Sequence, residues 1–312
     1  MNADGNREFN ARELDFGTGE EFPYFECGAC GSLLIAEVPA DIGRLYPADY
    51  YSFNEPRPPR GAGLKRRLKL ARTRLVLGWP RPLAGLLAAP PVVPDYLRWL
   101  GRMGLTTSAR ILDVGCGSGS LLATLRSWGF NNLAGVDPFI AGDIEFDGVH
   151  IRRATLPEIG GSYELLIFNH SFEHLPEPQA ALAEARQRLA PGGWALLRMP
   201  VAGALAWRTY GTDWVALDAP RHLCIPSERG MTLLAERCGF AVHRVEFDST
   251  ARQFWGSEQN RLGISYYDER SYRNNPSAAP FTATQIARWE RQARRLNAAH
   301  DGDCAAFLLQ CR

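Results

Sequence analysis

The sequence lacks any run of about 18 uninterrupted apolar residues, the length that a membrane-spanning helix needs. Its first residues, Met1 to Glu8, are polar and contain no apolar segment of the kind found in signal peptides. Net charge is also nearly absent, since 35 Lys and Arg residues balance 34 Asp and Glu residues. These absences predict a cytoplasmic protein without a transmembrane segment and argue against nucleic acid as a partner.

The seven cysteines are scattered and odd in number, which excludes a disulfide framework and predicts reduced thiols. Only Cys27 and Cys30 have the spacing of a zinc knuckle. A structural zinc site needs four ligands, and no second pair lies nearby in the sequence. We interpret the Cys-x-x-Cys as a turn that resembles a zinc knuckle, with bound zinc as the alternative.

Composition divides the chain into three segments. Residues 1–60 form an N-terminal extension, which we expect to be lid-like, and residues 61–94 hold a basic helix and a Pro-rich linker. The basic amphipathic helix is expected at 64–77, where it is either a solvated face or a weak contact with anionic lipid or a diphosphate. Residues 95–312 form the main domain, with an insertion at about 248–303. Nothing in the sequence indicates an oligomeric state.

From residue 95 onward, short apolar runs alternate with amphipathic segments, which predicts an α/β fold. We expect a Rossmann-like, seven-stranded, mostly parallel sheet with helices on both faces, whose last strand is an edge strand. The turn Pro191-Gly192-Gly193 is expected to precede the fifth strand. The predicted strands are 110–114, 133–136, 149–152, 163–168, 194–199, 241–247 and 305–311, and the predicted helices are 118–128, 177–189, 227–237 and, in the insertion, 284–297.

A glycine-rich turn follows the first of these strands. Gly115, Gly117 and Gly119 allow a sharp turn against which a ligand can lie, and Asp137, which ends the next strand, is placed to accept hydrogen bonds from ribose hydroxyls. Asp113, before the turn, suits a cofactor with a cationic amino-acid end. A nicotinamide dinucleotide site requires a glycine one residue later than Gly119, and a glycine-rich connection without a ligand leaves the second acid unexplained.

These motifs resemble the class I S-adenosylmethionine (SAM)-dependent methyltransferases over residues 95–250 and 304–312. The resemblance implies a site for the cofactor SAM. Its methionine end would lie at Asp113, Gly115 and Gly117, its ribose at Asp137, its adenine at Leu156 and its sulfonium near Asn169 or His170. The matching segments are 111–119, which includes Cys116 and Gly119, 135–138, which includes Pro138, and 154–157, 165–178 and 188–193.

The N-terminal extension also resembles a known group. Residues 16–31 followed by Tyr46–Phe53 are similar to bacterial methyltransferases found with glycan and polysaccharide biosynthesis genes. This resemblance implies a small-molecule or glycan acceptor.

Histidines are the candidate bases, because the ordinary pKa of about 6.5 suits proton removal from a hydroxyl. His222 is the leading candidate, with Asp218 as its orienting partner, and the alternative is a histidine that only pins its loop. His170 is a second, substrate-side candidate. Together with Glu173 and His174 it also has the spacing of a metal site. Ubiquinone O-methyltransferases have a second acid in place of His170, so we predict no metal and expect Glu173 and His174 to brace the loop.

Aromatic residues concentrate in the segments after the fifth and sixth strands, where they either stack on a ring substrate or pack the insertion. We predict O-methylation of a hydroxyl on a sugar or glycan intermediate. The alternatives are C- or N-methylation of a small molecule, a non-catalytic SAM-binding partner protein, and a zinc-dependent interaction protein. The aromatic residues are Trp207, Tyr210, Trp214, Trp255, Tyr266 and Tyr267.

Overall fold

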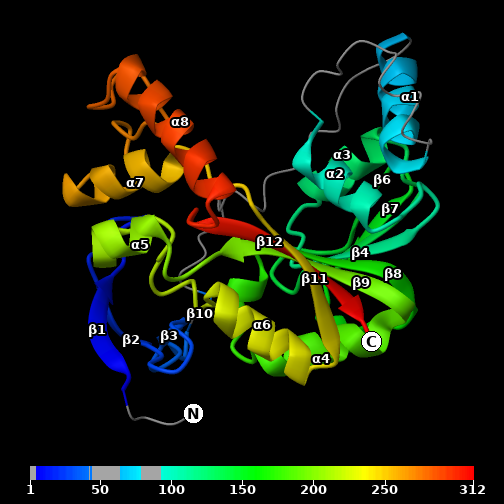
Figure 1. Cartoon of the computed structure of the whole chain (residues 1–312), viewed down its shortest axis with the longest axis horizontal. Coiled ribbons are helices and arrows are strands. Elements are labelled where there is room, and N and C mark those ends of the chain that lie inside the picture. Colours follow the sequence, from blue (N-terminus) through cyan, green and yellow to red (C-terminus); the bar gives the residue numbers. More distant parts are fainter. Residues whose placement is uncertain (1–4, 42, 44–63, 79–92) are drawn as a thin grey trace.

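The computed structural model describes residues 5–41, 43, 64–78 and 93–312. They form an α/β domain around one large sheet and a smaller sheet beside it (Figure 1). No helix in this described part is both long and apolar enough to cross a bilayer. The Tyr46–Phe53 run and the Pro-rich residues 56–63 and 80–91 lie outside the described residues.

The large sheet has the strand order β11-β12-β9-β8-β4-β5-β7-β6. Strands β9, β8, β4, β5 and β7 are parallel, whereas β12 and β6 run antiparallel to their neighbours. The predicted Rossmann-like fold is therefore confirmed, with the short β6 as a strand beyond those predicted. The strands are β4 (Arg110–Val114), β5 (Asn132–Val136), β6 (Ile144–Phe146), β7 (Val149–Arg152), β8 (Tyr163–Asn169), β9 (Leu189–Pro200), β11 (Phe240–Phe247) and β12 (Cys304–Cys311).

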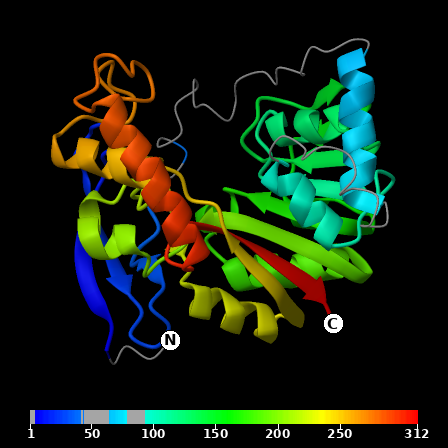
Figure 2. The same ribbon diagram turned by 45° about the horizontal axis from the view of Figure 1, so that its top comes forward.

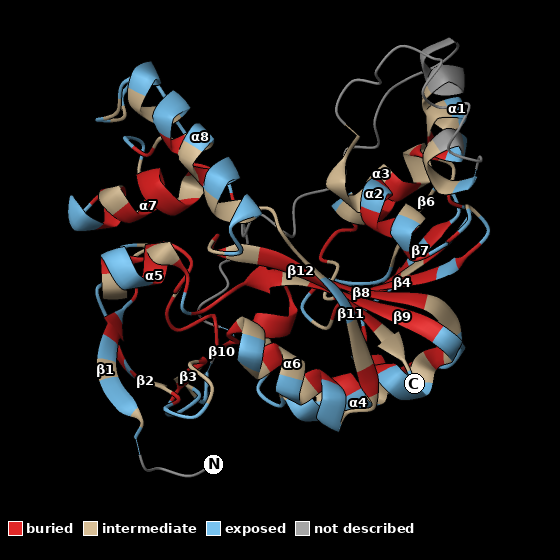
Figure 3. Cartoon of the chain, viewed as in Figure 1, coloured by how far each residue is buried: buried red, intermediate tan, exposed pale blue. Residues whose placement is uncertain are grey.

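Both faces of this sheet are covered because successive apolar side chains of its strands point to opposite sides. Ile111 and Leu165 pack with α2 and α3 on one face, whereas Leu112 and Leu166 pack with α4 and α6 on the other. Figures 1 and 2 show these two helical layers, and Figure 3 shows the buried strands between them. The helices are α1 (Leu64–Gly78), α2 (Asp95–Arg102), α3 (Ser120–Ser127), α4 (Pro178–Arg188) and α6 (Glu228–Arg237).

The last strand, β12, was predicted as an edge strand, and this prediction is wrong. It lies between β11 and β9, so that β11 forms the edge. All residues from Ala305 to Leu309 are fully buried. An uninterrupted apolar run is typical of a strand covered on both faces, but it does not specify which strands lie beside it in the sheet.

The Pro191-Gly192-Gly193 segment was predicted as a turn before the fifth strand, but it belongs to β9. Tyr163 of β8 pairs with Leu189, and the register then shifts so that Leu165 pairs with Trp194. Gly192 has φ +72°, which allows the extra residues to bulge out of the ladder. The predicted strand 194–199 is therefore confirmed but begins earlier.

The insertion contains two helices, α7 (Arg252–Arg261) and α8 (Ala283–Ala298). The predicted helix is confirmed in α8, which begins with a capping box between Thr282 and Gln285. Helix α7 was not predicted, because it buries polar residues such as Gln253 and Gln259 and lacks an apolar stripe.

A small antiparallel sheet joins the N-terminal extension to the rest of the chain. Its order is β1-β2-β3-β10, and the first three strands come from the extension. The Cys27–Cys30 segment is a turn between β2 and β3, as predicted. Since β10 follows β9 in the chain, the extension is bonded directly to the main domain. The strands are β1 (Arg7–Arg12), β2 (Glu21–Glu26), β3 (Leu33–Ile35) and β10 (Cys224–Ile225), with α5 (Leu205–Tyr210) packed nearby.

The aromatic residues singled out in the sequence mostly pack this junction. Trp207, Tyr210, Trp214 and Trp255 are all buried in one apolar cluster that joins the extension, α5 and the insertion. Tyr266 stacks on Trp255, and the Arg273 guanidinium covers the Tyr266 ring. The packing interpretation is confirmed for the four buried residues.

Candidate functional site

A pocket of about 590 Å³ opens at the carboxyl ends of β4, β5 and β8. This is the edge at which open α/β sheets bind ligands. Eight of the predicted site residues line it, namely Asp113, Gly115, Cys116, Asp137, Pro138, Leu156, Asn169 and His170. Four others, Gly117, Gly119, Asp218 and His222, are not among its lining residues.

The glycines between β4 and α3 are required by the protein's own packing. Gly115 and Gly119 have φ values of +71° and +87°, which side-chain-bearing residues rarely adopt. A Cβ atom on Gly115 would lie 2.5 Å from Cβ of Ser171, and one on Gly119 would lie 2.4 Å from Cδ1 of Ile151. These glycines were predicted to make room for a ligand, but at Gly115 and Gly119 the missing side chain makes room for a protein side chain.

Two buried carboxyl groups flank this turn. Asp137 accepts hydrogen bonds from the backbone N–H of Gly117 at 2.8 Å and of Phe139 at 2.9 Å, so it holds the turn. Asp113 is 1% exposed, and its Oδ1 atom has no hydrogen-bond partner among the described residues. Burial, and then the nearby charge of Asp137, raise the pKa of Asp113 to about 8. A ligand that donates a hydrogen bond to Asp113 would therefore be bound favourably.

Beside the turn, the segment that follows β8 forms part of the pocket wall and contains a short 3-10 helix, Phe172–His174. His170, with φ +51°, points its Nδ1 atom at Oε1 of Glu173 at 3.3 Å. Glu173 is fully buried, and burial acts to raise its pKa. The hydrogen bond from His170, and the positive charges that His174, His222 and His170 carry when protonated, outweigh burial and hold the pKa of Glu173 at about 2. The buried carboxylate is therefore ionised.

His222 lies behind this wall. Its Nδ1–H donates to the carbonyl oxygen of Ala216 at 2.8 Å, and its ring packs edge-on against His174 at 4.8 Å between centroids. The Nε2 atom lies 3.6 Å from Oδ2 of Asp218 and 3.9 Å from Oε1 of Glu173. Burial lowers the pKa of His222 to about 4, which makes the ring neutral near pH 7. Its role as the base stays a prediction.

The same side chains are the metal candidates. The ligand atoms of Glu173, His174 and His222 all lie within 4.8 Å of one another, a spacing that can hold a divalent cation. Within the described residues this is the one such cluster, so Cys27 and Cys30 find no further ligands there. The set brought together differs from the alternative considered in the sequence, because His222 takes the place of His170.

Two residues beside the pocket were missed in the sequence. The Tyr96 hydroxyl on α2 donates to Oδ1 of Asn169 at 2.6 Å. The Arg198 guanidinium on β9 donates to Nε2 of His170 and pairs with Asp248 at 2.6 Å. Arg198 interrupts the apolar strand 194–199 with a single charge, which is a signal of function that the sequence contains. Tyr96 has no comparable signal.

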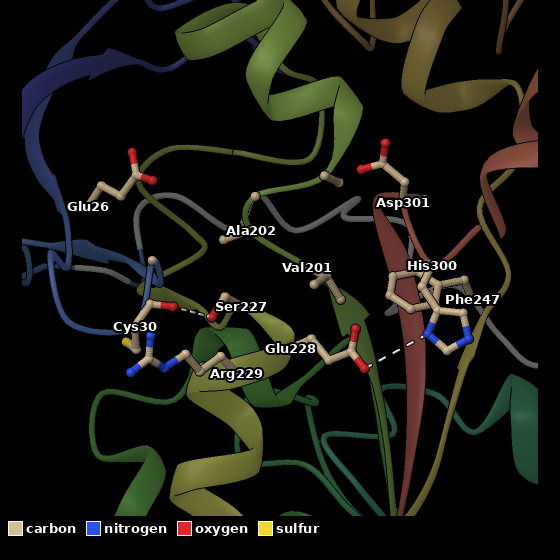
Figure 4. Close-up of a pocket in the computed structure, with 14 residues that line it drawn as sticks. Glu26, Cys30, Val201, Ala202, Ser227, Glu228, Arg229, Phe247, His300 and Asp301 are labelled. Atoms are coloured by element: carbon tan, nitrogen blue, oxygen red, sulfur yellow. Dashed lines mark hydrogen bonds and ion pairs between the residues drawn. The ribbon is translucent and has the colours of Figure 1, made fainter.

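A second pocket, of about 300 Å³, marks the junction of the N-terminal extension with α6 (Figure 4). Ser227 caps α6 by accepting from the N–H of Gly230 at 2.9 Å, and its hydroxyl donates to the carbonyl of Cys30. Glu228 lies 3.9 Å from His300, on the turn before β12. None of the predicted site residues lines this pocket.

Known proteins are similar to the part of the chain that forms the pocket beyond β4, β5 and β8. The model of a family described as "Methyltransferase domain" matches residues 91–245. A ubiquinone biosynthesis O-methyltransferase of Albidiferax ferrireducens is 22% identical over 203 residues, which cover 57% of this chain and 79% of that protein. Another, from Xanthomonas oryzae pv. oryzae, is 30% identical over 158 residues, which cover 45% of this chain and 63% of that protein. A solved structure of the mycolic acid cyclopropane synthase CmaA1 complexed with SAH has 16% identity and a TM-score of 0.43, and the alignment covers 70% of this chain and 86% of that one.

Proposed function

Since residues 91–245 form a class I SAM-dependent methyltransferase domain, with SAM as its methyl donor, we propose that the chain methylates a hydroxyl oxygen of a small-molecule acceptor. The observation that carries this proposal is the His170–Glu173 pair at the pocket beyond β4, β5 and β8. A hydroxyl must lose a proton on methylation, and a histidine oriented by a carboxylate suits that task. The ubiquinone biosynthesis O-methyltransferases named above also act on oxygen.

The residues of the pocket fit SAM. Asp113 offers a buried carboxyl oxygen without a partner among the described residues, which suits the cationic amino-acid end. Asp137 suits the ribose hydroxyls, and the buried Leu156 on the pocket wall suits the adenine. When bound, SAM supplies a methyl group on an electron-poor sulfonium.

His170 is the proposed base. Its Nδ1–H donates to the ionised Glu173, which leaves the lone pair on Nε2. Arg198 donates to that lone pair in the structure. An acceptor hydroxyl takes the place of Arg198 at Nε2, while Arg198 keeps its ion pair with Asp248. Glu173 then stabilises the protonated ring.

His222 remains the alternative base. Its Nε2 atom faces Asp218 and Glu173, and it is absent from the residues that line the pocket. For His222 to act on an acceptor, the His174 ring that packs against it would have to move. His170 already lines the pocket and only has to exchange its hydrogen bond from Arg198 for one from the acceptor, so we favour it.

Two classes of acceptor are compatible with the proposal. The sugar or glycan hydroxyl rests on the resemblance of the N-terminal extension, since the aromatic residues Trp207, Tyr210, Trp214 and Trp255 are buried in packing. The similarity to ubiquinone biosynthesis enzymes supports a hydroxyl on a ubiquinone precursor instead. A panel of acceptors should therefore contain nucleotide-linked sugars and ubiquinone precursors.

Transfer of tritiated methyl from SAM to this panel tests the proposal. We expect His170→Gln to lower kcat about 100-fold to 1,000-fold while SAM binding stays within about threefold, because general base catalysis is worth roughly this much. His150→Gln, at an exposed site on β7, is the matched control and should keep full activity.

Different results would contradict the assignment of the base and the proposal of O-methylation. Full activity of His170→Gln together with a large loss in His222→Gln would return the base to His222. Methyl transfer only to nitrogen or carbon, or SAM binding without transfer to any member of the panel, would contradict O-methylation.

A further inference from the structure

The loop between α5 and β10 contains a buried cation. The Arg221 side chain is 1% exposed and contacts Oε1 of Glu13 at 2.8 Å, Oδ1 of Asp218, and Oδ2 of Asp15 at 3.9 Å. Its guanidinium also lies over the ring of Phe16 at 4.9 Å. Three of these four partners belong to the N-terminal extension, so the cation ties the extension to the loop.

Within the N-terminal extension, backbone hydrogen bonds fix the position of the Glu13 carboxylate. Its carboxylate accepts hydrogen bonds from the backbone N–H of Phe16 at 3.0 Å and of Thr18 at 3.0 Å. On the other side, Oδ1 of Asp218 accepts hydrogen bonds from Nε of Arg221 at 2.8 Å and from its Nη2. The buried Arg221 guanidinium thus lies between the carboxyl groups of Glu13 and Asp218, whose positions are fixed, and removal of one would leave buried charge uncompensated.

The backbone of the same loop reaches the wall of the cofactor pocket. The carbonyl oxygen of Arg221 accepts from Nδ1 of His174 at 2.8 Å. The N–H of Leu223 donates to the carbonyl oxygen of Glu173 at 2.8 Å. From the extension, the Tyr24 hydroxyl donates to the carbonyl of His222 at 2.9 Å. His174 and Glu173 therefore take their positions from backbone atoms next to the buried cation.

We propose that Arg221, held by Glu13 of the N-terminal extension, is a positioning residue that orients His174 and Glu173 at the pocket. The extension then belongs to the catalytic unit, although none of its described residues lines the cofactor pocket. This inference rests on the proposed function only in taking that pocket as the SAM site.

The test compares Glu13→Gln with Glu26→Gln in the full chain. Both replace a carboxylate of the extension by an amide, but Glu26 pairs with the exposed Arg7 at the surface. Two quantities are measured, the NMR signal of the His174 Nδ1 proton in ¹⁵N-histidine-labelled protein and the dissociation constant of SAM by calorimetry. The His174 signal is assigned with His174→Gln.

We expect Glu13→Gln to shift or broaden the His174 signal and to weaken SAM binding about tenfold, since a small misplacement of a site residue has effects of this size or larger. Glu26→Gln should leave both quantities as in wild type. If Glu13→Gln does not fold, Glu13→Asp, which keeps the charge but withdraws it from Arg221, should show the same changes to a smaller extent.

A Glu13 variant with lower thermal stability but an unchanged His174 signal and unchanged SAM affinity would overturn the inference, because the cation would then be only structural. Equal effects of the Glu13 and Glu26 substitutions would also overturn it. Neither measurement needs an acceptor, so a wild-type chain that binds SAM but methylates no hydroxyl would count against the proposed function alone.

Discussion

Glu173 shows how one buried residue organises the pocket. It has no exposed surface, yet its carboxylate contacts His170 directly and lies within 3.9 Å of His222. A buried carboxylate needs such partners, because desolvation would otherwise make its ionised form unfavourable. Among the histidines near this anion, His170 is the one that Glu173 orients by a direct hydrogen bond, and this proposed base lines the pocket.

The buried Asp15 makes the stability of the fold depend on pH. Burial, followed by the charge of Asp218, raises the pKa of Asp15 from its ordinary value of 3.8 to about 8, although Arg221 and Arg252 oppose this and Glu13 adds to it. The folded protein therefore binds the proton more tightly than the unfolded chain. The stability from protonated Asp15 is fully present below about pH 4 and is lost as the pH rises to about 8.

Asp15→Asn removes this titration. The unfolding free energy of the variant relative to wild type should rise from pH 4 to pH 8, by at most about 1.4 kcal/mol per pH unit. Urea unfolding at pH 5 and pH 7 measures the difference, and Asp95→Asn on the exposed surface of α2 is the control. A pH dependence of Asp15→Asn identical to that of wild type would contradict the assignment.

At the scale of elements, the turn from β4 to α3 depends on the absence of a side chain at Gly115. Gly115→Ala should lower the unfolding free energy by about 2–4 kcal/mol, because a positive φ and a clash with Ser171 act together. Gly104 is the matched control, since it has φ +69° but no atom within 4 Å of the point that an alanine Cβ would occupy. Gly104→Ala should therefore cost only about 1 kcal/mol. Equal losses in urea unfolding would show that the Ser171 contact is unimportant.

Most helices and strands whose apolar residues pack in or against the large sheet could be predicted from the sequence. The β4 and β7 boundaries agree because β4 is a short, mostly apolar run and β7 alternates apolar and polar residues, and turn residues flank both strands. Burial of polar residues hid α7, and the inner position of β12 depends on strand order, which a single strand's composition does not specify.

The candidate site was also predictable only in part. Residues at strand ends, such as Asp113 and Asp137, line the pocket because the parallel sheet brings strand ends to one edge. The buried position of His222 behind the pocket wall depends on a hydrogen bond to Ala216 within a loop. The sequence of a loop has no periodic pattern from which such a contact could be predicted. Tyr96 reaches Asn169 from a helix that is distant in sequence.

At the scale of the whole molecule, the N-terminal extension and the main domain share structure. The pairing of Leu34 with Cys224 completes the small sheet, and the apolar cluster around Trp214 continues from the extension into the insertion. The cofactor pocket and the extension are consequently linked through the loop that carries Arg221. This link explains how a segment outside the matched region 91–245 can influence the pocket.

The most direct test of the account is a calorimetric titration of the full chain with SAM. Wild type should bind SAM saturably at a single site. Asp137→Asn should weaken binding about tenfold or more, because a hydrogen bond to a charged group is lost. Asp147→Asn, an exposed acid that also has positive φ, should bind as wild type does. Absence of SAM binding by wild type, or full affinity in Asp137→Asn, would contradict the assignment of this pocket.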